Sequence, residues 1–122
     1  MGKYVNPAAL DAAIDYIAGS DKQIACSAQP TTYAEANALM LAEVEMVPGD
    51  FTKANGSVSG RKLTVGAKPG ATVTNAGTAN HIALVNTTTS TLRLVTTMPA
   101  QVLTAGNPVT FASFSEELRD PT

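Results

Sequence analysis

The chain has 122 residues, of which 44% are hydrophobic and 15% are charged, and its formal net charge is −2. This length suits one core, so we expect residues 1–122 to form a single domain. The hydrophobic content excludes a disordered tail, and the slightly acidic balance provides no basic field for a phosphate backbone. We therefore expect no nucleic-acid partner.

The first predicted element is a helix near the N-terminus. Asn6 is a good N-cap, and Pro7 suits the first helical position because the N–H that proline lacks has no partner there. Apolar residues then recur at spacings of four and three, and Gly19 is a natural stop. The apolar stripe consists of Leu10, Ile14 and Ile17. Asp11 and Asp15 lie four residues apart without a third ligand, so we interpret them as a solvated face rather than a catalytic or metal-binding pair.

Three short elements are predicted before residue 51. The segment QIACSA (23–28) reads as a strand. Thr32 and Glu35 match a capping box, which predicts a short helix or turn that begins at Tyr33. Residues 43–47 alternate polar and apolar side chains and predict a second strand, which the turn residues 48–50 (Pro-Gly-Asp) end.

From residue 51 onward, short alternating runs replace the helical pattern, with Gly, Asn and Pro between them. The strongest strand predictions are HIALVN and TLRLVTTM, which we interpret as a hairpin around a Thr-rich turn. In this hairpin we expect Ile82 and Leu84 to share an inward face with Leu92 and Leu94.

These elements predict an α+β fold that is mainly β, with an N-terminal helix followed by an antiparallel β-sandwich or partial barrel. Along the single domain we distinguish a helix-containing part (1–50), a β-rich part (51–115) and a polar tail (116–122).

Few residues could carry chemistry. His81 is the only histidine and Cys26 the only cysteine, so neither a disulfide within the chain nor a multi-cysteine metal site can form. We interpret Cys26 as a small buried hydrophobe and His81 as a half-exposed residue at a strand end. No nucleotide-binding glycine motif is present. We therefore predict no catalytic residue, no cofactor and no metal, and hence a non-enzymatic role.

The N-terminal residues MGKYVNPAAL lack a basic segment followed by an apolar core, so we expect no signal peptide. No run approaches the roughly 18 apolar residues of a membrane span. We accordingly expect a product that is cytosolic at synthesis, with no membrane partner.

Several stretches resemble small structural proteins encoded by tailed bacteriophages and prophages. In the second half these are the HIALV strand, the short Thr/Ser turn, a second strand, LTAGNPVT, and an aromatic-containing final strand before an acidic tail; ACSAQPTTYAEA in the first half also looks like that group. The resemblance implies a virion component that is made in the host bacterial cytoplasm. It is carried by structural motifs, so no functional residue can be transferred through it.

Within the virion we expect a capsid decoration or cement protein that contacts the major capsid protein as a homo-oligomer. A neck, tail or fibre component is the alternative, as is a receptor- or glycan-binding module, although the 5% aromatic content disfavours the module. The candidate subunit contacts are apolar or long side chains at the chain ends, which could instead pack on their own domain. They are Tyr4, Val5, Leu118 and Arg119.

Overall fold

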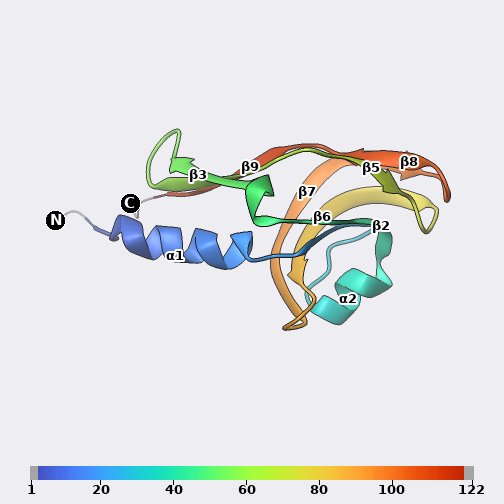
Figure 1. Ribbon diagram of the computed structural model, residues 1–122, viewed down its shortest axis with the longest axis horizontal. Helices are drawn as coiled ribbons and strands as arrows, with labels where there is room; N and C mark the ends of the chain where they lie inside the picture. Colours follow the sequence, from blue (N-terminus) through green and yellow to red (C-terminus); the bar gives the residue numbers. More distant parts are fainter. Residues whose placement is uncertain (1–2, 120–122) are drawn as a thin grey trace.

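The computed structural model describes residues 3–119 and shows a mainly β chain that does not close into a barrel (Figure 1). Its elements in chain order are α1 (Pro7–Ala18), β1 (Lys22–Cys26), α2 (Tyr33–Ala38), β2 (Met40–Glu45), the 3-10 turn η1 (Pro48–Asp50), β3 (Phe51–Asn55), β4 (Arg61–Val65), β5 (Lys68–Thr72), β6 (Gly77–Asn86), β7 (Thr91–Leu103), β8 (Pro108–Phe111) and β9 (Phe114–Leu118). An N-terminal helix with antiparallel sheets confirms the predicted fold class.

The strands form two layers. One is a four-stranded antiparallel sheet in the order β2-β1-β6-β7. The other consists of a three-stranded sheet, β3-β4-β9, and a two-stranded sheet, β5-β8. These two small sheets continue one another, because β5 follows β4 and β9 follows β8 after two residues each. In Figure 1 this layer runs above β6 and β7, and α2 lies below them.

The middle of the four-stranded sheet, formed by β1 and β6, is buried on both faces. One face packs against the second layer, with Leu84 of β6 in the same apolar cluster as Leu63 and Val65 of β4. The other face is covered by α2, where Ala36 packs with Ala83 and residues of β1. A strand that is covered on both sides shows no simple alternation of polar and apolar residues. This explains why the run from 82 to 85 is buried at every position.

Helix α1 begins as predicted. The Asn6 side chain accepts a hydrogen bond from the N–H of Ala8 at 2.9 Å, and Pro7 occupies the first turn. At the other end the N–H of Gly19 donates to the carbonyl of Asp15 at 3.0 Å. Ile14 is fully buried, and the helix packs against β3 and β4.

The predicted capping box of α2 forms only in part. The N–H of Glu35 donates to Oγ1 of Thr32 at 3.1 Å, as the motif requires. The Glu35 carboxylate, however, accepts a hydrogen bond from the hydroxyl of Thr31 at 2.6 Å instead of returning to the backbone of Thr32. Even so, the helix starts at Tyr33, as predicted.

The second predicted strand is displaced. It was expected over residues 43–47, but β2 covers Met40–Glu45. Leu41 and Ala42, near the start of the strand, are adjacent in sequence and both buried, because both faces of the sheet are covered there. The start of the strand therefore lacks the alternation of polar and apolar residues by which a strand is predicted. The strand ends early because the Asp50 carboxylate accepts a hydrogen bond from the N–H of Val47 at 2.8 Å, which fixes the turn into η1.

The β6–β7 hairpin exists, but one part of its predicted face is wrong. The register pairs Leu84 with Leu94 and Val85 with Leu92, so a bulge lies between these two pairs. The extra residue, Arg93, moves Leu92 to the opposite face of the sheet. There Leu92 packs with Val85 on the face that α2 covers. Leu94 keeps the expected face and joins the cluster of Leu84.

The predicted tail also needs correction. Residues 116–118 belong to strand β9, which pairs with β4 through Glu116↔Leu63 and Leu118↔Arg61. Alternation explains this, because Phe114, Glu116 and Leu118 all take the inward register positions of an edge strand. Residues 120–122 of the predicted tail lie outside the described residues.

One buried polar side chain stands out in β1. Gln23 is 1% exposed and lies opposite Val44 on one side and Leu84 on the other. Neither its amide nitrogen nor its amide oxygen has a hydrogen-bond partner among the described residues. A buried amide without partners is destabilising, because its atoms lose their hydrogen bonds to water.

We therefore expect Gln23→Met to stabilise the protein, since methionine has a similar volume and no amide to desolvate. The melting temperature should rise by roughly 3–8 °C. The matched control is Gln29→Met at an exposed position, which should leave the melting temperature unchanged. A lower melting temperature for Gln23→Met would mean that the amide is satisfied in solution and would contradict this account.

Candidate contact surface

The structure brings the two predicted contact segments to one end of the molecule. Tyr4 and Val5 precede α1, and Leu118 and Arg119 end the described part of the chain. In Figure 1 the start of α1 and the end of β9 lie at the same side, together with the turn between β3 and β4. We call this region, made of residues 3–6, 56–60 and 117–119, the terminal end.

The four predicted contact residues differ in exposure. Tyr4 is 80% exposed, whereas Val5 is half-buried. Leu118 packs against the cluster that contains Ile14, so part of its surface belongs to the core of its own domain. Arg119 is exposed and forms an ion pair with Glu117 at 2.9 Å. Of the four, Tyr4 therefore offers the most unburied apolar surface.

Val58, at the tip of the β3–β4 turn, was missed from the sequence. It is 72% exposed, one of the largest apolar exposures among the described residues. The available signal was an apolar residue inside the turn sequence NGSVSG, where small polar residues are usual. The turn also requires glycine at Gly60, which has φ +70° and whose missing side chain would overlap the carbonyl of Leu118.

A carboxylate holds this turn in place. Glu117 of β9 accepts hydrogen bonds from the backbone N–H of Ser57 and, at 3.4 Å, from that of Val58. The hydrogen bond from Ser57 is the main reason that the pKa of Glu117 lies below its usual value, and Arg119 lowers it further. The exposed valine is thus presented on a turn whose backbone is fixed.

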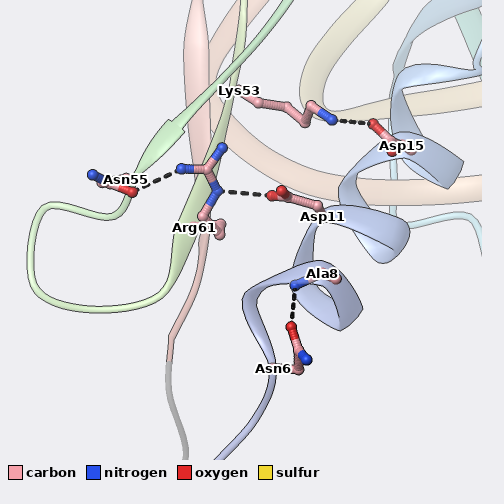
Figure 2. A network of polar contacts seen from close by, with 7 residues as sticks. All are labelled: Asn6, Ala8, Asp11, Asp15, Lys53, Asn55 and Arg61. Carbon is pink, nitrogen blue, oxygen red and sulfur yellow. Dashed lines mark hydrogen bonds and ion pairs between the residues drawn. The ribbon is translucent and has the colours of Figure 1, made fainter.

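Two ion pairs join α1 to the same hairpin (Figure 2). Nε of Arg61 lies 2.7 Å from the Asp11 carboxylate, and its Nη1 donates to Oδ1 of Asn55 at 2.7 Å. Lys53 pairs with Asp15 at 2.8 Å. Asp15 lies on an exposed face, as expected, and Asp11 is half-buried. In addition, each carboxylate holds a cation of the hairpin against the helix.

The single cysteine and the single histidine of the chain lie side by side on β1 and β6, away from the terminal end. The register places His81 directly opposite Cys26, the neighbourhood that a Cys–His nucleophile would need. No hydrogen bond joins them, and Nδ1 of His81 instead lies 2.6 Å from Oδ1 of Asn80. Cys26 is 0% exposed, and burial raises its pKa to about 11, which keeps the thiol protonated at neutral pH. Its interpretation as a buried hydrophobe is confirmed.

Within residues 3–119, no group of three His, Cys, Asp or Glu side chains is placed to hold a metal ion. No helix in this part of the chain is both long and apolar enough to cross a bilayer. Comparisons with protein-family models, with curated proteins and with solved structures found no match. A function for this chain is therefore inferred from its structure and from the sequence resemblance.

The lowered pKa of Glu117 predicts how the turn responds to acid. A carboxyl group with a depressed pKa contributes stability above its ordinary value of 4.5 and loses it as the pH falls through the folded value. We expect the amide NMR signals of Ser57 and Val58 to titrate together below pH 4.5. Glu117→Gln, the control, should abolish this titration, and a midpoint at or above 4.5 in the native chain would contradict the account.

The burial of Cys26 predicts a thiol that does not react in the native state. At pH 8 we expect an aromatic disulfide reagent to modify it only after denaturant is added, because both its burial and its raised pKa suppress the thiolate. The control is Ser57→Cys, whose added thiol is exposed and should react rapidly under native conditions. Comparable native rates for the two thiols would refute the prediction.

Proposed function

We propose that this chain is a structural protein of a tailed-phage virion, where it decorates and cements the capsid exterior as a homo-oligomer. The observation that carries the proposal is the terminal end. There the exposed side chains of Tyr4 and Val58 lie at the end of the molecule where both chain-end segments meet, and Glu117 fixes the backbone of the turn that carries Val58. Exposed apolar patches mark interaction sites, and we propose that these two side chains contribute to one.

The rest of the chain suits a contact role. Only 15% of its residues are charged, so its surface can pack against another protein with little cost for desolvating charges. The ion pairs of Arg61 and Lys53 orient α1 against the hairpin before any partner arrives. A surface that is already ordered loses less entropy on binding.

The proposed mechanism is mass action. A decoration protein that binds the assembled capsid lattice, and not its dissociated subunits, lowers the free energy of the assembled state. Many equivalent copies are needed to cover a symmetric lattice, which favours repeated contacts between identical chains. The proposal assigns no catalysis, cofactor, nucleic acid or membrane; the protonated, buried thiol of Cys26 supports a non-enzymatic role.

The neck, the tail or a fibre is the alternative location, since the same terminal end could contact those proteins. A glycan-binding module is not favoured. Such a module stacks its ligand on clustered aromatic faces. Of the two largely exposed tyrosines among the described residues, Tyr16 is stacked with Arg93, whose guanidinium carbon lies 4.1 Å from the ring centroid, which leaves Tyr4 alone.

The test mixes purified protein with undecorated capsids and measures bound copies and the capsid melting temperature. We expect saturable, stoichiometric binding and a higher melting temperature. Replacing Val58→Ser should weaken binding by roughly three- to tenfold, because a few exposed apolar anchors contribute most of the affinity in such contacts. The matched control, Val102→Ser, removes a 78% exposed valine from β7 and should bind like the native chain.

Two results would count against the proposal. Absence of binding and of any thermal shift would remove the capsid role. Density for the chain on the neck or tail of the particle would support the alternative location.

A further inference from the structure

An apolar cleft opens along one side of the two layers. It has a volume of about 280 Å³ and lies between β7 and the run from β8 into β9. Its apolar lining includes Ile82, Met98, Leu103, Phe111 and Phe114, and no charged residue within 3–119 lines it. Strands β7, β8 and β9 are all edge strands of their sheets, so this side of the molecule is open.

The edge beside the cleft is not suited to pairing with another strand. His81 pairs with Thr97 and Ala79 with Gln101, so residues 98–100 stand opposite Asn80 alone. This bulge contains Pro99, which has no N–H to donate. Bulges and prolines of this kind prevent a sheet from growing at its edge. The cleft is therefore suited to an inserted side chain and not to an added strand.

A carboxylate without a partner among the described residues lies two positions beyond the cleft along β9. Glu116 follows the cleft residue Phe114 by two positions on β9 and takes the inward register position opposite Leu63. Its side chain is half-buried and forms no hydrogen bond or ion pair with another described residue. Successive inward positions of a strand lie roughly 7 Å apart. The cleft and the carboxylate together would receive an apolar side chain with a neighbouring cation.

The segment before α1 has this combination. Lys3 and Tyr4 are both exposed, and the side chain of Lys3 forms no ion pair with the rest of the described chain. In Figure 1, α1 starts at one end of the molecule, whereas β8, which forms one wall of the cleft, lies toward the other end. The segment is thus placed to reach the cleft of another molecule and not its own.

We propose that the cleft binds Tyr4 of a second copy of this chain, with Lys3 of that copy beside Glu116. The apolar walls accept the aromatic ring, and the threonine hydroxyls at Thr96, Thr97 and Thr110 of the lining are available to the phenol hydroxyl. This inference deepens the proposed function and rests on its claim that the protein forms homo-oligomers. The contact is heterologous, with one surface donating and a different surface receiving.

The inserted segment and the cleft that receives it can be altered by separate substitutions. Tyr4→Ala removes the inserted ring, whereas Ala112→Trp places a bulky side chain at a cleft-lining position that is exposed. We expect the native chain to self-associate in sedimentation velocity at high concentration and each variant alone to be at least tenfold weaker. An equimolar mixture of the two variants should regain association, because one still has its arm and the other its cleft.

The charged part of the contact has its own test. Lys3→Glu and Glu116→Lys should each weaken association by about two- to fivefold, the range for a solvent-accessible ion pair. The double variant should recover the native affinity, because the pair is restored with reversed signs. Val102→Ser is the control for both series, since Val102 does not line the cleft. Circular dichroism of every variant shows whether it is folded.

The outcomes separate this contact from the wider proposal. A mixture of Tyr4→Ala and Ala112→Trp that stays dissociated would overturn the inference, as would undiminished association of either variant alone or a native chain that does not associate. Capsid binding by the native chain is measured independently. Its failure would overturn the proposed decoration role and leave the contact between copies standing.

Discussion

The structure depends on burying the middle of the four-stranded sheet on both faces. Strand β6 lies between β1 and β7, and its residues from Ile82 to Val85 alternately contact the second layer and the cover formed by α2. Apolar burial of this kind is the main favourable contribution to folding. This core lies between the two layers and under α2. Other molecules can therefore reach the parts outside it, which are the chain-end segments, the β3–β4 turn and the edge cleft.

Much of the fold follows from local sequence signals. The start of α1 at Asn6 and Pro7, the start of α2 after Thr32, and the hairpin around TTTS could all be predicted, because caps and turns act over a few residues. The errors arise where tertiary packing decides. The two-sided cover of β2 conceals its boundaries, and the bulge at Arg93 reverses the face of Leu92. The alternation of inward and outward residues in β9 spans only Phe114–Leu118, which is too short for the sequence to distinguish a strand from a polar tail.

The contact surface could be predicted only in part. Long or apolar side chains near the chain ends indicated Tyr4, which the structure leaves exposed, but local sequence cannot show that Leu118 packs inward. The β3–β4 turn lies next to β9 only through pairings across more than 50 residues of chain, such as Glu117 with the N–H of Ser57. For the same reason the cleft between β7 and β8–β9 leaves no local signal in the sequence. The proposed contacts with identical neighbours rest on these features.

The most direct test of the proposed role is a cryo-EM map, at a resolution that shows side chains, of phage particles assembled in cells that make this chain. The account predicts copies on the outside of the capsid, with Tyr4 of one copy buried at the boundary with its neighbour and Val58 facing another virion protein. Isolated copies whose terminal ends face solvent would contradict it.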